Sequence, residues 1–320
     1  MPIAGPNENG RRSPVFLVGA ERSGSTMMRL MLSHHPDIAF AGESDFIVDA
    51  ITPEGRFMKR EAFLRMLSLD RVFGNRKLNI AQGLNFVGLA NDFLDQIAAT
   101  KGNPAVVGMT IHRHYDRLLH LWPDARFIHL VRDGRDVALS TIPMGWAGNM
   151  WRGIRLWVDA EENWHALSER LPDDRFITVK YENVARDAEY ELRRVTDFLG
   201  LTFGPEMLRY SESSTYSSPH GDSVGKWRKA DPKDLSAAEF RGARWLLQNG
   251  YLLSGTVKAP SIFRRAMFRI QDRIVIANYR RKKFGTKLWL ESLIYSRFGS
   301  KKQHARIVRA QNQIIDRHLK

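Results

Sequence analysis

The chain has 320 residues, of which 43% are hydrophobic, and its formal net charge is +14. That length and apolar content suffice for a sizeable core, so we expect a globular protein built around one main domain. Disulfides, cysteine-ligated zinc and a cysteine nucleophile are excluded because the sequence contains no cysteine. Residues 1–13 lack the apolar segment of a signal peptide. We therefore expect a flexible leader and a cytoplasmic protein.

The positive charge is concentrated in the C-terminal part of the chain. Residues 255–320 contain 17 Lys and Arg but only 3 acidic residues. The first 254 residues carry 32 basic and 32 acidic side chains, so the body of the chain is neutral. Any argument about an acidic partner therefore concerns the tail and not the body.

The first predicted unit is a strand, a loop and a helix. Residues 14–18 form an apolar run typical of a short buried strand, and apolar residues at helical spacing continue from Met27 to Leu32. Between them, Gly19-Ala20-Glu21-Arg22-Ser23-Gly24-Ser25-Thr26 matches the Walker arrangement G-x-x-x-x-G-K-[ST], except that Ser25 replaces the lysine. Backbone N–H groups at a helix N-terminus bind phosphate even without that lysine. Because the missing charge would reach the β- and γ-phosphates of a nucleoside triphosphate, the loop favours another phosphate-bearing ligand.

The rest of the body alternates between apolar strands and amphipathic helices. The alternation predicts an α/β fold, with a parallel sheet covered by helices on both faces. Ligands of such sheets bind beyond the carboxyl ends of the strands, where Gly19–Thr26, Arg132 and Tyr181 all fall. In chain order, we expect a largely helical stretch from Gly42 with helices at 58–69 and 86–100, strands at 105–108 and 126–131, helices at 135–141 and 151–171, a strand at 175–180 and a helix at 188–199.

Several segments together resemble the sulfotransferases that use 3′-phosphoadenosine 5′-phosphosulfate (PAPS). Gly19–Pro36 is similar to the family's 5′-phosphosulfate loop and the helix that follows it. Phe127–Ser140 is similar to the segment that binds the 3′-phosphate. Val224–Lys229 resembles a loop that closes over the nucleotide, and Val179–Val184 resembles the family's segment near the adenine.

The resemblance covers roughly residues 14–250 and implies a P-loop sheet like that of nucleotide kinases. We accordingly place the sulfotransferase domain at 14–254 and a basic helical extension at 255–320. The implied donor is PAPS, with PAP as the product and no metal required. The residues implied to bind the nucleotide are Arg22, Ser23, Gly24, Ser25 and Thr26 in the first loop, Arg132 and Ser140 at the 3′-phosphate, Tyr181 near the adenine, and Lys226 and Trp227 in the closing loop.

Sulfuryl transfer is an in-line displacement, so catalysis rests on positioning and on stabilisation of charge. Arg22 and the loop N–H groups are placed to stabilise the departing 5′-phosphate. Gly42-Glu43 indicates kinship with the bacterial and protein-tyrosine sulfotransferase branch, which implies that Glu43 is the catalytic base. The sequence reads Met109-Thr110-Ile111-His112 where many relatives have Lys-Thr-Pro or Lys-Thr-His. His112 is therefore a second candidate for the base, and the sequence does not choose between them.

Other polar side chains have structural interpretations. Asp133 is expected to be a helix N-cap, and Asp136 is expected to form an ion pair on the helix surface. His34 and His35 have no carboxylates at matching spacing, so no metal site is expected.

The tail places basic residues among apolar and aromatic ones at helical spacing, as around Ile262-Phe263, Met267-Phe268 and Ile274-Val275-Ile276. This pattern is typical of an interfacial helix on anionic lipid. It is equally typical of a helical extension that packs on the body or on a second subunit of a homo-oligomer. Nucleic acid is a weaker third partner, because no recognised module is present and the body is neutral.

The favoured function is therefore transfer of a sulfuryl group from PAPS to a hydroxyl acceptor. If the tail lies on the inner face of the membrane, that acceptor would be a lipid or a membrane-borne glycan. The first alternative is a P-loop kinase or NTPase, against which the missing lysine argues. The second is a non-enzymatic binder that reaches a membrane surface through the tail.

Overall fold

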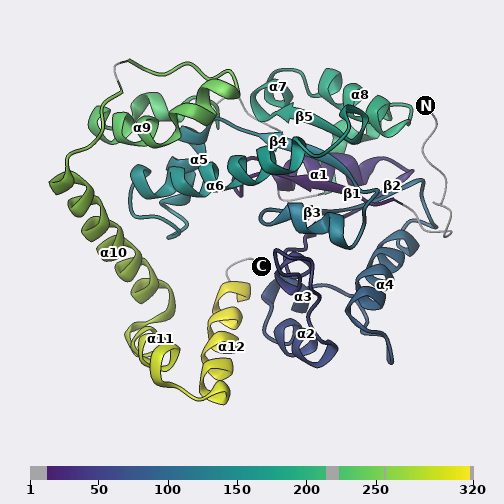
Figure 1. The fold of residues 1–320 in the computed structure, drawn as a ribbon, viewed down its shortest axis with the longest axis horizontal. Helices are drawn as coiled ribbons and strands as arrows, with labels where there is room; N and C mark the ends of the chain where they lie inside the picture. The colour runs from purple at the N-terminus through teal and green to yellow at the C-terminus, as the bar shows by residue number, and fades with distance from the viewer. Residues whose placement is uncertain (1–12, 214–222, 256, 318–320) are drawn as a thin grey trace.

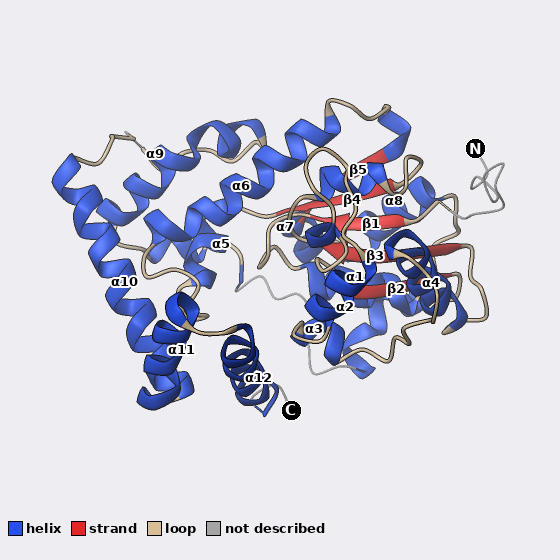
Figure 2. Cartoon of the chain, turned by 60° about the horizontal axis from the view of Figure 1, so that its bottom comes forward, coloured by secondary structure: helices blue, strands red, loops and turns tan. Residues whose placement is uncertain are grey.

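The computed structural model describes residues 13–213, 223–255 and 257–317. Five parallel strands form one sheet in the order β2-β3-β1-β4-β5 (Figure 2). The strands are β1 (Val15–Val18), β2 (Ile38–Glu43), β3 (Val106–Ile111), β4 (Arg126–Val131) and β5 (Phe176–Lys180). The predicted parallel α/β fold is confirmed. The predicted leader at 1–13 lies outside the described residues, apart from residue 13.

The prediction of a largely helical stretch from Gly42 is wrong at its start, because Gly42 and Glu43 end the edge strand β2. Only Ile38, Ala39 and Phe40 of this strand are buried, so its apolar run is too short to indicate a strand. Its pairing with β3 shifts register between Ala41 and Glu43, and Glu43 pairs with Thr110. This irregularity brings Glu43 to the carboxyl edge of the sheet, beside the phosphate loop.

Helices cover both faces of the sheet. Side chains of Val15 and Leu17 pack with α1 (Ser25–His34), α7 (Tyr181–Arg186) and α8 (Ala188–Leu199). Phe16 and Val18 pack on the opposite face of the sheet. The remaining helices of the body are α2 (Arg60–Leu67), α3 (Arg71–Gly74), α4 (Phe86–Ala99), α5 (Gly134–Thr141), α6 (Met150–Ser168) and α9 (Pro232–Gln248). A third cluster of buried apolar side chains joins α5 and α6 to α9. Short 3-10 helices lie at Val48–Ala50, Tyr115–His120, Asp173–Arg175, Pro205–Ser213 and Lys226–Lys229.

Three C-terminal helices, α10 (Ile262–Phe284), α11 (Thr286–Phe298) and α12 (Lys301–Arg317), leave the body near α9 and return toward α3 (Figure 1). The departure is held by Asp272, whose Oδ1 accepts from the backbone N–H of Gly148 at 2.7 Å. At the return, Asp316 accepts from Asn75 Nδ2 at 2.9 Å and lies 3.4 Å from Arg71 Nη1. Among the described residues, no helix has the length and apolar content needed to span a bilayer.

Candidate active site

The loop after β1 has the backbone geometry of an anion-binding turn. Gly19 has φ of 143°, and a Cβ at that position would lie 2.3 Å from the carbonyl oxygen of Leu130. Gly24 caps α1 with φ of 95°, and its Cβ would lie 2.5 Å from the ring of Tyr181. Both positions therefore require glycine. Ser23 is buried, and its Oγ has no hydrogen-bond partner within the described chain. The hydroxyl is thus available to a ligand at the N-terminus of α1.

A second group of predicted residues meets at the ends of β4 and β5. The guanidinium of Arg132 lies 4.5 Å above the ring of Tyr181. Its Nη1 donates to the carbonyl of Arg22 at 3.1 Å, and its Nη2 donates to the carbonyl of Ser223. The structure thus brings Arg132, Tyr181 and the first loop together. Arg132 Nε is buried and, in the part of the chain that the structure describes, has no hydrogen-bond partner.

The late loop is anchored by Asp136, which is buried rather than on the helix surface as expected. Asp136 accepts from the backbone N–H groups of Gly225 at 2.7 Å and Trp227 at 2.9 Å. Burial raises the pKa of Asp136. The ring of Trp227 lies 3.5 Å from the guanidinium carbon of Arg135, and Lys226 is exposed.

The side chain of Ser140 makes its hydrogen bond away from this group. Its Oγ donates to the carbonyl of Val137 at 3.0 Å, inside its own helix. Within the described residues no hydrogen bond joins Ser140 to Arg132. Its contact with the 3′-phosphate remains a prediction.

The two candidate bases lie together beside Ser25. His112 Nε2 is 3.4 Å from Ser25 Oγ and 3.9 Å from Glu43 Oε1. Its Nδ1 lies 3.0 Å from the carbonyl oxygen of Gly19, and its backbone N–H donates to Asp45 Oδ1 at 2.8 Å. Because a carbonyl only accepts, Nδ1 carries the hydrogen, and in neutral His112 Nε2 is then an acceptor.

Two cavities adjoin these residues. The phosphate-loop cavity has a volume of about 450 Å³. The α6 cavity has a volume of about 600 Å³. Glu43 lines the first and His112 lines the second. The other lining residues used below are Ser25, Thr26, Arg29 and Arg76 in the phosphate-loop cavity, and Glu21, Arg113 and Asn163 in the α6 cavity.

Three ionisable residues of this region were not predicted as site residues. Arg76 donates from Nη1 to Ser44 Oγ at 3.0 Å and from Nη2 to the carbonyl of Glu43. Burial, together with the neighbouring Arg29, lowers the pKa of Arg76 to about 10. Burial also raises the pKa of the carboxyls of Glu21 and Asp45. Glu21 lies within the loop motif, and this position is the one sequence feature that could have marked any of the three as a site residue.

Metal ligation has no support in the described residues, where no group of three or more His, Asp or Glu side chains could hold an ion. Anions have several candidate donors instead, namely the loop N–H groups, Ser23 and Arg132. The arrangement is therefore suited to a ligand with phosphate groups.

Comparison with known proteins decides the family. The protein-family model described as "Sulfotransferase family" matches residues 14–205 of this chain. The chain belongs to the sulfotransferase family. The protein-tyrosine sulfotransferase of Drosophila melanogaster is 25% identical over 247 residues, which cover 73% of this chain and 47% of that protein. Protein-tyrosine sulfotransferase A of Caenorhabditis elegans is 24% identical over 272 residues, covering 75% of this chain and 68% of that protein.

The family expected from the order of the motifs is thereby confirmed. The chain spans 47% and 62% of the lengths of the relatives from Drosophila melanogaster and Gallus gallus. Among solved structures, the sulfotransferase domain from the curacin biosynthetic pathway has a TM-score of 0.48 and 19% identity, covering 81% of this chain and 98% of that chain. A mouse sulfotransferase solved with PAP has a TM-score of 0.46 and 14% identity, covering 74% of this chain and 85% of that chain.

Proposed function

We propose that this sulfotransferase moves the sulfuryl group of PAPS to a hydroxyl acceptor. The observation that carries the proposal is the placement of two anion-binding groups at one edge of the sheet. The loop after β1 offers Ser23 and the N-terminus of α1, and the ends of β4 and β5 offer Arg132 above Tyr181. PAPS has a 5′-phosphosulfate and a separate 3′-phosphate, so two separated sites suit it better than one triphosphate site.

The residues present fit the nucleotide. Arg132 is buried, and the carbonyls and the ring around it hold its guanidinium in place. Its unpartnered Nε leaves donor capacity for a phosphate, which a planar guanidinium binds in bidentate fashion. At the other group, Ser23 and the N–H groups of the loop would hold the 5′-phosphosulfate, whose bridging bond is the one that breaks in the transfer.

We assign the acceptor to the phosphate-loop cavity and the base to Glu43. This cavity is lined by the loop hydroxyls of Ser25 and Thr26, so a hydroxyl bound there lies beside the proposed 5′-phosphosulfate site. Glu43 is 48% exposed and lines the same cavity, whereas His112 lines the other one. His112, held between Gly19 and Asp45, then positions Ser25 and Glu43 and does not take the proton itself.

Ligand binding tests the nucleotide site. PAP should raise the melting temperature, and Arg132→Ala should weaken PAP by about tenfold to a hundredfold because a charge-assisted contact is lost. AMP lacks the 3′-phosphate, so its affinity should be the same in Arg132→Ala and wild type. Arg155→Ala, at an exposed position of α6, is the matched control. Stabilisation by ATP with Mg²⁺ and not by PAP would support the kinase alternative and refute the proposal.

Turnover with PAP binding intact tests the base. Glu43→Gln should lower kcat by roughly a hundredfold or more, the usual contribution of a general base. His112→Asn should cost less. If Glu43→Gln stays active while His112→Asn is inactive, the acceptor lies in the α6 cavity and the assignment is wrong.

We further propose that the C-terminal helices rest on an anionic membrane surface, on its inner face, and that the acceptor is a lipid or a membrane-borne glycan. Phe263, Met267 and Ile270 of α10 are exposed, Phe263 by 88%, and exposed Arg269 and Arg273 lie among them. Apolar and basic side chains on one helix match a lipid interface.

Flotation with vesicles of phosphatidylserine and phosphatidylcholine tests this surface. The double substitution Phe263→Asp and Met267→Asp should abolish flotation, and Leu247→Asp at an exposed position of α9 should not. If wild type does not float and instead dimerises through these helices in size-exclusion chromatography, the membrane proposal is refuted in favour of a homo-oligomer.

A further inference from the structure

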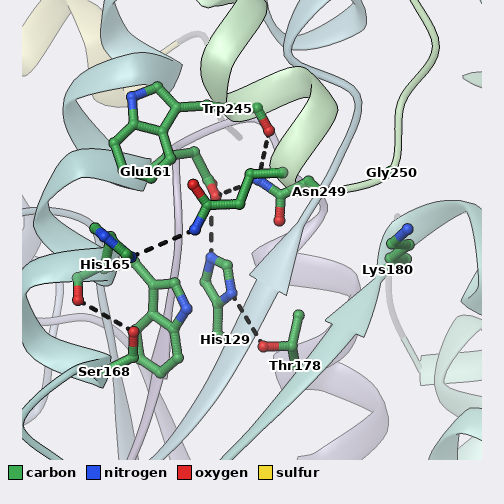
Figure 3. A pocket seen from close by; sticks show the side chains of 11 residues that line it. His129, Glu161, His165, Ser168, Thr178, Lys180, Trp245, Asn249 and Gly250 are labelled. Atoms are coloured by element: carbon green, nitrogen blue, oxygen red, sulfur yellow. Dashed lines mark hydrogen bonds and ion pairs between the residues drawn. The ribbon is translucent and has the colours of Figure 1, made fainter.

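A cavity of about 410 Å³ lies beside the edge strand β5, between the sheet, α6 and α9 (Figure 3). None of the residues proposed for the sulfuryl transfer lines it. Its walls come from the middle of β4 and β5 and from the C-terminal halves of the two helices. The lining residues that carry the argument are His129, Glu161, Trp164, Thr178, Lys180 and Trp245. We call this space the β5 cavity.

Two buried side chains face each other at one end of the β5 cavity. His129 is 1% exposed and Glu161 is 2% exposed, and His129 Nε2 lies 3.5 Å from Glu161 Oε1. Neither of these two atoms makes a hydrogen bond within the described chain. The other carboxylate oxygen of Glu161 accepts from Asn249 Nδ2 at 2.9 Å, and His129 Nδ1 is 3.4 Å from Thr178 Oγ1.

These contacts define what the pair can bind. The Thr178 hydroxyl can donate or accept, and we infer the tautomer in which His129 Nδ1 donates to it; His129 Nε2 is then an acceptor, as Glu161 Oε1 is. Two neighbouring buried acceptors are satisfied together by a group with at least two N–H donors. An ammonium supplies three, and its charge offsets that of the buried Glu161 carboxylate.

The rest of the β5 cavity extends this pattern. The ring of Trp164 stacks on that of His129 with centroids 4.4 Å apart, and Trp245 lies across from them on α9. Indole surfaces favour both an apolar body and a nearby cation. Lys180, the last residue of β5, stands apart from the acidic end (Figure 3). The cavity thus has the Glu161 carboxylate and the indole rings toward one side and the Lys180 ammonium on the other.

We propose that the β5 cavity binds a small zwitterion of the free amino acid class. Its ammonium donates to Glu161 Oε1 and His129 Nε2, its carboxylate pairs with Lys180, and its side chain contacts Trp164 and Trp245. This site is separate from the proposed transfer of the sulfuryl group.

Calorimetric titration of the full chain with three matched probes tests the proposal. L-norleucine carries both charges, n-pentylamine lacks the carboxylate, and hexanoate lacks the ammonium. Norleucine should bind best, pentylamine less well, and hexanoate not at all. Glu161→Gln should weaken norleucine and pentylamine by about tenfold or more, because a hydrogen-bonded charge is lost. Glu189→Gln, at an exposed carboxyl of α8 outside the cavity, is the matched control and should bind as wild type does.

Lys180→Met gives a second readout that does not depend on changing a buried group. This variant should bind pentylamine as wild type does and should no longer prefer norleucine over pentylamine. The proposal is overturned if norleucine and pentylamine fail to bind at millimolar concentration, if hexanoate binds as well as norleucine, or if folded Glu161→Gln binds unchanged. PAP titrated into the same samples separates a failure of this site from a failure of the nucleotide site.

Discussion

Arg135 is the centre of a buried charge cluster that ties the end of β4 to α9, and its removal should be costly. Its side chain is 2% exposed. It donates from Nε and Nη2 to Asp133 at 2.9 and 2.7 Å and from Nη1 to Glu239 at 2.6 Å. It also lies over the ring of Trp227. Because Asp133 directly follows Arg132, this cluster also holds the backbone of the proposed nucleotide site.

The expected cost of Arg135→Met follows from the groups it leaves behind. The substitution keeps most of the side-chain volume but leaves two buried carboxylates without their cation, which costs about 3–5 kcal/mol. Both carboxylates keep some partners, since Asp133 still accepts from the backbone N–H of residue 135 at 3.0 Å and Glu239 from the N–H and Oγ of Ser254 at 2.9 and 2.7 Å. We therefore expect the lower end, about 3 kcal/mol, which corresponds to a fall in melting temperature of about 6–12 °C for a domain of this size.

Urea unfolding monitored by circular dichroism measures this loss. Arg155→Met is the matched control, because Arg155 forms an exposed pair with Asp159 four residues on. Such a pair contributes about 0.5 kcal/mol or less. If Arg135→Met lowers the free energy of unfolding by no more than the control does, the account of the buried cluster is wrong.

Three further predictions concern other carboxyls. Burial raises the pKa of Glu21, so the folded state binds its proton more tightly, and stability is lost as pH rises through the folded pKa. The advantage of Glu21→Gln in free energy of unfolding should therefore grow from pH 4.5 toward neutrality, and urea melts showing a constant difference would contradict this. Asp136→Asn should leave an N–H of the late loop unpaired, which should lower the free energy of unfolding by about 1–3 kcal/mol and speed amide exchange at 225–227. Unchanged exchange at these residues would show that Asp136 does not hold the loop. Asp316→Ala should lower stability by about 1 kcal/mol or less yet speed amide exchange in α3, and protection equal to wild type would show that α12 does not hold it.

Strands could be predicted where both faces are buried. Four of the six residues in the run 126–131 are apolar, and β4 has those bounds. Helix α8 also has its predicted bounds, because Asp187 caps it and Gly200 ends it in a left-handed conformation. Strand β2 escaped prediction because its last three residues are not buried. Its strand conformation depends on pairing with β3, which is distant in the sequence.

The candidate site also has parts that could be predicted from the sequence and parts that could not. The loop at Gly19–Thr26 could be predicted because its glycine spacing, between an apolar run and a helical pattern, is a local feature of the sequence. The late loop could be recognised, but its anchor could not. Asp136 looks like a surface residue of α5 until residues 225–227 fold back over it. No local pattern records a contact between segments about ninety residues apart.

The missing lysine of the loop motif shows what tertiary packing adds. The loop has Ser25 where the motif has its lysine, and the one basic residue within Gly19–Thr26 is Arg22, which is exposed. The fold places Arg29 and Arg76 beside Gly42, where a Cβ would lie 3.6 and 3.4 Å from their guanidinium nitrogens. A pKa of about 10 keeps Arg76 charged at neutral pH, although it is buried near another arginine. Arg29, Arg76 and Glu43 all line the phosphate-loop cavity, so the fold supplies two positive charges and one negative charge where the loop motif lacks its lysine.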